Sequence, residues 1–390
     1  MWRFRLMSLF LCVACTSGAF VPEYAAYHNL SSVYRRVGAL AEAFPAFVRV
    51  DHSFKSKNGL SQLVVRLSNF SDSSHAAEPH VQSFKVKVLL SYGESGREFV
   101  PVESIIYFLR HVVRGLGAPK DSAEEAFGRN LFSKVELYVV VMLNPDGRNH
   151  VERTGDYCWK GTATGADLGT AFGPGVDHSP REPECNVLLN LTKAQAFDAF
   201  VSFHSGLREI HLPFAESQYK NAGPSPANME AMADLARTMA ESVEPRLAYG
   251  RTNRVARFPV EGTAFNFMAA VRKIPFSLAV QLWGDGRDLG PDCFAHFNPP
   301  SDSLQATLEG LHPLYQKMFL HLISWKAKQM SLAFHVESDG PSPAMCLLMA
   351  AAVVVTLLFV CQHRFPNPMR SNPRRRVISL KSLSSSLHVS

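Results

Sequence analysis

The sequence predicts a single α/β domain built on a mixed, largely parallel twisted sheet with helices on both faces. Roughly 320 residues lie between two apolar runs near the chain ends, which is enough for one large domain with a buried core. In this part, short continuous apolar runs alternate with longer amphipathic runs, and the sequence shows no internal repeat. Continuous apolar strands between helices are typical of a sheet that is covered on both faces.

The apolar and amphipathic runs give the expected elements in order. Four apolar runs predict buried strands: Val86–Leu90, Val135–Met142, Ala199–Phe203 and Phe276–Leu282. Three amphipathic runs predict helices: Glu103–Arg114, Asn228–Ser242 and Ser303–Trp325. Ligands of such sheets bind at the carboxyl ends of the strands. Glu98, His204 and Gln281 lie at or just beyond predicted strand ends, so we expect the chemistry there.

The N-terminus is typical of a secretory signal peptide over residues 1–19. Arg3 and Arg5 precede the apolar run Leu6–Val13, and a small-residue cleavage site follows at Ser17–Ala19. A buried helix or membrane anchor is the weaker interpretation, because the apolar run is short. We therefore expect residues 20–336 to form a domain that lies outside the cell or in a lumen.

A second apolar run, Ala344–Cys361, carries no charge and has the length of a short transmembrane helix. Residues 362–390 after it contain basic residues and no acid, which places this tail in the cytosol. The sequence thus predicts a single-pass type I membrane protein, with a stalk over 337–343, a span over 344–361 and a Ser-rich tail. A cleaved lipid-anchor signal is the alternative, and the long basic tail argues against it.

The net charge of +6 comes from the predicted ends of the chain. The signal holds two basic residues and the tail six, without acids, so the part between them stands at −2. This balance gives no support for nucleic acid as a partner.

Three cysteines fall in the predicted lumenal domain: Cys158, Cys185 and Cys293. We expect one disulfide and one free thiol, and proximity in the sequence favours Cys158–Cys185. Three sequons predict N-glycosylation at Asn29, Asn69 and Asn190.

The turn Gly93–Glu98 follows the first predicted strand and leads into a helix. A strand that ends in a small polar turn is a common place for a metal-binding His and Glu. Here Glu98 is present, and the residue three before it is Ser95. His204 alone is weak evidence, since a single histidine after an apolar strand is more often a structural residue.

Taken together, the motifs are more specific than any one of them. In order and spacing they resemble the zinc metallocarboxypeptidase family across roughly Tyr24 to Leu322: Gly93–Glu98, Leu143–Gly147, Gly155–Gly161, Gly165–Leu168, Ser202–Gly206, Trp283–Gly286, Asp292–Phe294 and Phe297–Pro299. The resemblance implies that family's α/β fold. It also implies one zinc held by a His-x-x-Glu pair and a later His, with a Glu as general base.

Carried over residue by residue, the resemblance places two zinc ligands at Glu98 and His204, with Ser95 at the third ligand position. A serine hydroxyl is a poorer zinc ligand than imidazole. We therefore expect zinc to be bound weakly or not at all, and to be the cofactor only if the protein is active. Gln281 stands at the position of the general base, and its amide oxygen is essentially non-basic.

The remaining positions of the family site also differ. Gly169 and Thr170 stand where an Asn-Arg pair would clamp the substrate's C-terminal carboxylate, so the bidentate cation is lost. Lys160 stands where an Arg polarises the scissile carbonyl, and it keeps the charge without the planar fork. Losses in ligand, base, clamp and electrophile together make peptide hydrolysis by the family mechanism improbable.

Three hypotheses follow. The first is a catalytically inactive carboxypeptidase-like domain that binds a peptide or protein ligand in its former cleft. The second is an active zinc metallocarboxypeptidase with a rearranged site, in which His178 or His211 supplies the missing ligand. The third, a hydrolase with Ser95 as nucleophile, lacks a Gly-x-Ser-x-Gly motif. Without a metal, we expect Glu98 to pair with His204 or with Lys160.

Overall fold

The computed structural model describes residues 22–71, 85–173, 176, 182–214, 226, 228–252, 262–286, 292–338 and 343–364. The predicted signal peptide, and residues 365–390 of the predicted tail, lie outside this part of the chain. The chain divides into two compact units, residues 1–330 and 331–390.

The first unit is an α/β domain built on an eight-stranded sheet in the order β1-β2-β4-β3-β5-β8-β6-β7. The strands are β1 (Val48–Asp51), β2 (Val64–Leu67), β3 (Val86–Ser91), β4 (Val135–Val140), β5 (Ala199–His204), β6 (Leu207–Leu212), β7 (Ala248–Arg251) and β8 (Phe276–Trp283). The central strands β4, β3, β5 and β8 are parallel to one another, while β2 and β6 join them antiparallel. The predicted mixed, largely parallel sheet is confirmed, and its four predicted strands are the four central ones.

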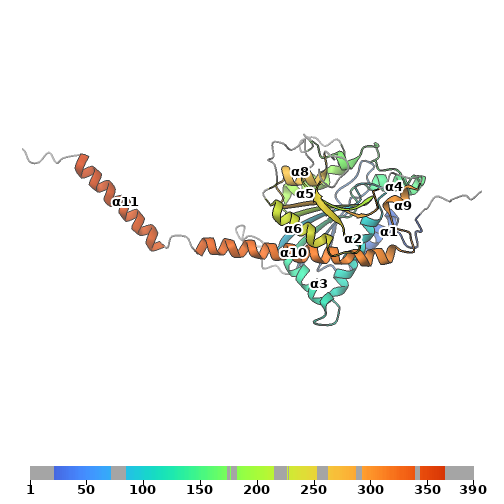
Figure 1. Cartoon of the computed structure of the whole chain (residues 1–390), viewed down its shortest axis with the longest axis horizontal. Coiled ribbons are helices and arrows are strands. Elements are labelled where there is room, and N and C mark those ends of the chain that lie inside the picture. Colours follow the sequence, from blue (N-terminus) through green and yellow to red (C-terminus); the bar gives the residue numbers. More distant parts are fainter. Residues whose placement is uncertain are drawn as a thin grey trace, which may run out of the picture. The chain divides into compact units, whose positions relative to one another are not determined.

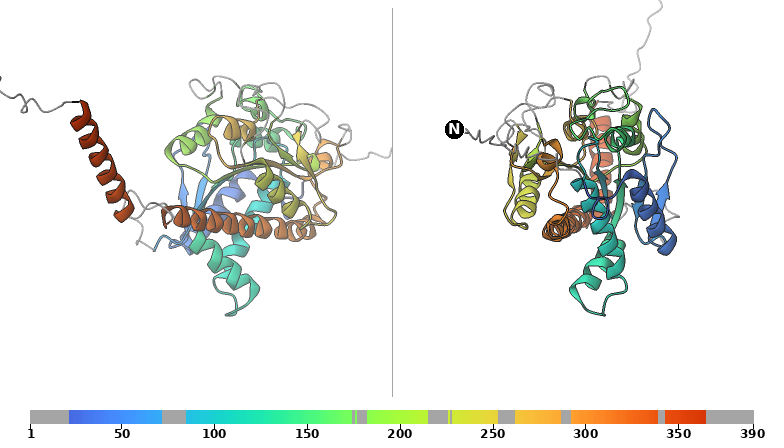
Figure 2. Two further views of the ribbon diagram at one scale, coloured as in Figure 1. Left: turned by 60° about the vertical axis from the view of Figure 1, so that its left-hand side comes forward. Right: turned by 90° about the vertical axis from the view of Figure 1, so that its right-hand side faces the viewer.

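Helices cover both faces of this sheet, and strand side chains alternate between two cores (Figures 1 and 2). On β3, Val86, Val88 and Leu90 enter one core while Leu89 enters the other. The first core is closed by α1 (Leu30–Ala43), α2 (Val100–Gly115), α3 (Ala123–Lys134), α6 (Met229–Ala240) and α10 (Leu304–Ser338). The second is closed by α5 (Asn186–Ala194) and α8 (Ala264–Ala270).

The three predicted helices correspond to α2, α6 and α10, and α10 continues to Ser338, beyond the expected end at Trp325. The first two residues of the predicted stalk, Glu337 and Ser338, therefore belong to α10. Residues 339–342 lie outside the described part.

Local sequence explains several helix ends. Asn29 caps α1 by accepting a hydrogen bond from the Ser32 amide, at 2.9 Å. Ser122 caps α3 in the same way, through the amide of Glu125. The short helix α4 (Pro145–Thr154) begins with proline in its first turn and ends at Gly155, whose φ of 70° suits glycine.

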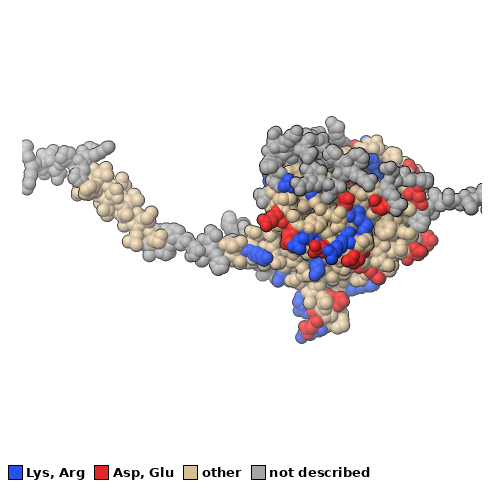
Figure 3. Space-filling view, viewed as in Figure 1, with Lys and Arg blue, Asp and Glu red and all other residues tan. Residues whose placement is uncertain are grey.

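Charged side chains of both signs lie side by side on the face of the domain shown in Figure 3. Asp234 and Arg237 of α6 form one such exposed pair. Interspersed charges give no strong field of one sign over this face.

The second unit contains α11 (Pro343–Arg364), which includes the predicted transmembrane residues. Across the described ranges, no helix has the combination of length and apolar character needed to span a bilayer. The predicted span over 344–361 stays a prediction.

Of the predicted glycosylation sites, Asn190 is exposed, whereas Asn29 and Asn69 are half-buried. Glycosylation of all three stays a prediction.

Candidate functional site

The site is built at the carboxyl ends of β3, β5 and β8, where three parallel strands meet one edge of the sheet. Parallel pairing sets Ser91 beside Ser202 and His204 beside Gln281. The turn after β3 then carries Glu94, Ser95 and Glu98 over the end of β5. Parallel register thus brings together residues that lie more than a hundred positions apart in the sequence.

The turn is held against α4 by close backbone packing. Gly93 has a φ of 66°, a conformation that favours glycine. A Cβ atom on Gly96 would collide with the backbone carbonyl of Gly147 in the first turn of α4. The two glycines of the motif are therefore structural requirements of the turn.

A buried amide, Asn144, connects the turn to its surroundings. Its Oδ1 accepts a hydrogen bond from the Gly147 amide at 2.8 Å, which caps α4. Its Nδ2 donates to the carbonyls of Glu94 at 3.2 Å and Gly161 at 3.0 Å. One side chain thus fixes the turn, the helix and the loop that carries Lys160.

A second buried amide, Asn298, fixes the other end of the turn. Helix α2 has no side-chain cap of its own. Instead, Asn298 Oδ1 accepts hydrogen bonds from the amides of Phe99 at 2.7 Å and Val100 at 3.0 Å. Its Nδ2 donates to the carbonyls of Arg97 and Phe294. Asn298 is fully buried, so it supplies polar partners that water cannot.

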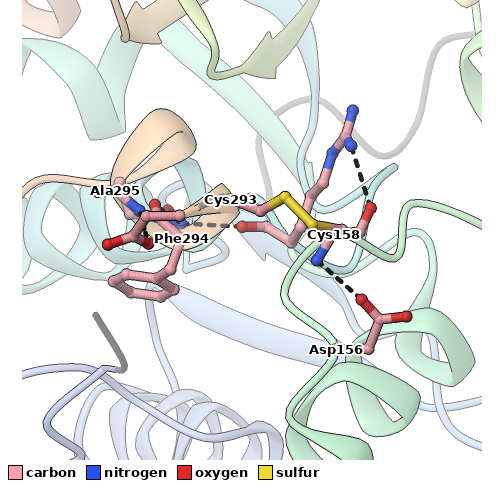
Figure 4. The surroundings of a disulfide bond; sticks show 8 residues. Asp156, Cys158, Cys293, Phe294 and Ala295 are labelled. Carbon is pink, nitrogen blue, oxygen red and sulfur yellow. Dashed lines mark hydrogen bonds between the residues drawn. A yellow bond between two sulfur atoms is a disulfide. The ribbon is translucent and has the colours of Figure 1, made fainter. Parts of the chain in front are cut away.

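The disulfide joins Cys158 to Cys293, with their Cα atoms 5.2 Å apart (Figure 4). The prediction of Cys158–Cys185 is therefore wrong. Cys185 is a free thiol buried in the core beneath α5 and α8, and burial raises its pKa. Proximity in the sequence gave the wrong partner, because Cys158 is bonded to the first residue of α9 (Cys293–Phe297), 135 residues further along the chain.

The disulfide lies next to the turn. Arg97 Nη1 donates to the Cys158 carbonyl at 3.1 Å, and its guanidinium carbon lies 4.0 Å from the ring centre of Phe297. Asp156 accepts from the Cys158 amide at 3.1 Å (Figure 4). The disulfide and Asn298 therefore tie the same C-terminal segment to the same turn.

The centre of the site is a histidine between two carboxylates. His204 Nδ1 lies 3.5 Å from Glu98 Oε2, and Nε2 lies 3.9 Å from Glu94 Oε2. The Ser205 amide also donates to Glu98 Oε2, at 3.2 Å. The predicted pairing of Glu98 with His204 is confirmed.

Charge and burial act in opposite directions on this group. Burial by itself would lower the pKa of His204, but the carboxylates of Glu94 and Glu98 raise it above the usual value. Burial raises the pKa of Glu94. A protonated imidazole between carboxylates is therefore the favoured state of His204 at neutral pH.

Lys160 does not reach Glu98. Its Nζ lies 2.5 Å from Asp167 Oδ2, and both side chains are well exposed to solvent. Asp167 Oδ1 also accepts from the amide of Gly169, and the Thr170 hydroxyl donates to the Asp167 carbonyl. The structure thus brings the predicted electrophile and clamp positions together around Asp167.

Five oxygen atoms at the site are buried without a hydrogen-bond partner among the described residues: Ser91 Oγ, Glu94 Oε1, Ser95 Oγ, Ser205 Oγ and Gln281 Oε1. Such atoms are costly unless water or a ligand satisfies them. Glu94 Oε1 and Gln281 Oε1 are acceptors, so a partner of either atom would have to be a hydrogen-bond donor.

The residues present do not fit a three-ligand zinc centre. Within the described residues, no group of three or more His, Cys, Asp and Glu side chains is arranged to hold a metal. In this arrangement Glu94 and Glu98 face different nitrogens of the His204 ring, so the two carboxylates do not converge on one ring nitrogen. Ser95 offers only a hydroxyl at the third position.

Of the two histidines considered as replacement ligands, only His211 lies within the described residues, and it is not part of a metal-binding group there. His211 lies on β6 with Nε2 3.4 Å from Glu209, and burial lowers its pKa to about 4. His178 lies outside the described residues.

Sequence reasoning missed the roles of Glu94, Asn144, Asp167 and Asn298. Glu94 had one local signal, an acid in a turn that follows an apolar strand. The two asparagines belong to the recognised motifs, but their partners come from distant segments.

Comparison with known proteins agrees with this architecture. Residues 33–312 match the model of the family described as zinc carboxypeptidase. A protein of Saccharothrix mutabilis subsp. capreolus named zinc carboxypeptidase is 24% identical over 161 residues, which cover 40% of this chain and 34% of that protein. The match thus spans about a third of the length of this curated relative.

Solved structures show the same fold at low sequence identity. Thrombin activatable fibrinolysis inhibitor is similar with a TM-score of 0.61 and 18% identity, over 76% of this chain and 75% of that one. Carboxypeptidase A from Helicoverpa armigera gives 0.61 and 18%, over 77% and 75%. A metallo-carboxypeptidase from Burkholderia cenocepacia gives 0.55 and 16%, over 76% and 70%.

The role of Asn298 can be tested by replacing it with alanine. We expect Asn298→Ala to lower the free energy of unfolding by about 2 kcal/mol or more, because two buried amides at the start of α2 lose their acceptor. Chemical denaturation measures the change, with Asn58→Ala, at an exposed side chain, as the control. Equal stability of the two variants would contradict the role assigned to Asn298.

The disulfide can be mapped directly. Digestion without reduction, followed by mass spectrometry, should yield a linked peptide pair that contains Cys158 and Cys293. The Cys185 thiol should react with an alkylating reagent only after the protein is unfolded, because it is buried. A Cys158–Cys185 peptide pair, or rapid alkylation of Cys185 in the native protein, would contradict the structure.

Proposed function

The chain belongs to the zinc carboxypeptidase family, and we propose that it is a catalytically inactive member that binds a peptide or protein ligand in its former cleft. The observation that carries the proposal is the arrangement around His204, where both ring nitrogens face carboxylates. A metal ligand needs a neutral nitrogen with a free lone pair. In the arrangement that the structure shows, each ring nitrogen of His204 faces a carboxylate instead, that of Glu94 or that of Glu98.

The chemistry at the other positions supports the same proposal. Hydrolysis needs a base that takes a proton from the attacking water, and Gln281 has no basic atom. It also needs a cation near the scissile carbonyl, and the charge of Lys160 is paired with Asp167. Loss of a positioned general base alone typically costs 10²–10⁴-fold in rate.

A binding role is supported by what the cleft retains. Asn144, Asn298 and the Cys158–Cys293 disulfide hold the turn and its neighbours in a fixed geometry. Glu94 Oε1 and Gln281 Oε1 remain as buried acceptors that a ligand with N–H groups, such as a peptide, could satisfy.

The alternative is an active zinc-dependent metallocarboxypeptidase with a rearranged site. One observation favours it: Glu94 adds a third buried group beside Glu98 and His204, so a shift of the His204 ring would bring a new ligand set within reach. This alternative requires proteolysis that depends on zinc and on His204.

A peptide-cleavage assay distinguishes the inactive binding domain from the active metallocarboxypeptidase. We expect the wild-type protein to release no residues from peptides with either free or amidated C-termini, and the His204→Ala variant to give the same background. The double variant Ser95→His/Gln281→Glu, which restores the two missing groups, serves as the test of the assigned positions.

Wild-type turnover that a chelator stops and His204→Ala abolishes would contradict inactivity and establish the alternative. If wild type cleaves peptides and the restoring changes do not raise the rate, the roles assigned to Ser95 and Gln281 are wrong.

We further propose that the domain is anchored to a membrane as a type I protein. The support is the sequence pattern: an N-terminal run typical of a signal, the charge-free run Ala344–Cys361 and the basic segment after it. In intact vesicles from expressing cells, protease should remove only the C-terminal tail from the cytosolic side, and alkaline carbonate should leave the protein in the membrane. Release by carbonate, or loss of the large domain to cytosolic protease, would contradict this topology.

A further inference from the structure

A groove on the α1–α2 side of the domain has no part in the site described above. One pocket of about 440 Å³ lies between the segment before α1, α1 itself and Arg110 of α2. A second, of about 220 Å³, lies between α2 and the start of α10. Both are lined by Ala25, His28, Arg36 and Arg110, so the two pockets meet at these residues and form one groove.

The groove carries an excess of positive charge. Arg36 and Arg110 lie where the pockets meet, and Arg35 lines the larger pocket. Burial lowers the pKa of Arg110, and the charges of Arg114 and of Arg36, which lines the same groove, lower it further. Converging like charges are destabilising unless an anion compensates them.

No carboxylate in the described residues compensates them. The only acid among the described residues that line the two pockets is Glu103. Its Oε1 accepts from the His28 amide at 2.7 Å and its Oε2 lies 2.5 Å from His28 Nδ1, so both oxygens are already engaged. Within the part of the chain that the structure describes, Arg36 and Arg110 form no hydrogen bond or ion pair.

The positions of the two arginines are fixed by the fold. Arg36 belongs to α1 and Arg110 to α2, two helices that are packed against the same core. Glu103 holds the segment before α1 against α2 through His28, which closes one wall of the groove. The two arginines therefore reach the groove from two separate helices.

We propose that this groove binds a phosphate monoester, with the tetrahedral dianion between Arg36 and Arg110. Guanidinium groups match such oxyanions with two parallel hydrogen bonds each, and two cations balance the charge of a dianion better than that of a single carboxylate. The volume on both sides exceeds that of one oxyanion and leaves room for the molecule that carries it. Tyr24, beside Arg36 in the larger pocket, offers a ring wall for that carrier.

The test uses the full-length protein and isothermal titration with sodium sulfate, inorganic phosphate and sodium acetate at matched ionic strength. We expect one saturable site for sulfate or phosphate with a Kd on the order of 1 mM, and at least tenfold weaker binding of acetate. Inorganic sulfate and phosphate are the probes of a tetrahedral dianion, and acetate is the control for a single negative charge.

The variants Arg36→Gln and Arg110→Gln should each weaken binding of the dianion at least tenfold. Arg129→Gln is the matched control, because Arg129 is an exposed arginine paired with Glu125 on α3. Equal unfolding midpoints of the three variants show that they are folded. Absence of saturable binding, acetate binding as tight as sulfate and phosphate, or the same affinity in all variants would overturn the proposal. None of these results depends on whether the carboxypeptidase-like site is active.

Discussion

The parallel pairing of β3, β5 and β8 is the constraint on which the candidate site depends. It brings the turn after β3, the end of β5 and the end of β8 to one edge of the sheet. Glu98, His204 and Gln281 can then lie together although they come from distant parts of the sequence. A change in register by one residue would turn His204 and Gln281 to the opposite face.

We interpret the structural framework around the site as retained from the family, and the chemical groups within the site as changed. Asn144 and Asn298 fix the two ends of the turn, and the Cys158–Cys293 disulfide joins two segments that contact it. These parts would suit a catalyst as well as a binding module. In our proposal the groups that would perform hydrolysis are the ones replaced, so the family's fold alone does not decide the activity.

The central fold could be predicted because its signals are local. The strands β3, β4, β5 and β8 are continuous apolar runs, and α2, α6 and α10 are long amphipathic ones. The outer strands β1, β2 and β7 have four residues each, and β6 is buried only in its second half. Their place in the sheet is decided by tertiary pairing.

The positions of the site residues could be predicted from the sequence, but their contacts could be predicted only in part. Glu98 and His204 meet as expected, but Lys160 pairs with Asp167 and Cys158 with Cys293. The role of Glu94 depends on the fold of the turn, which no periodicity reveals. The groove between Arg36 and Arg110 depends on how α1 and α2 pack, so a charge count of the sequence does not show it.

The central claim is that His204, Glu98 and Ser95 no longer form a zinc centre. The most direct measurement is the zinc content of the purified protein, determined by mass spectrometry after dialysis against a buffer with micromolar zinc. The account predicts far less than one equivalent, with the same value for the His204→Ala variant. One equivalent of zinc in the wild type that is lost in His204→Ala would contradict it.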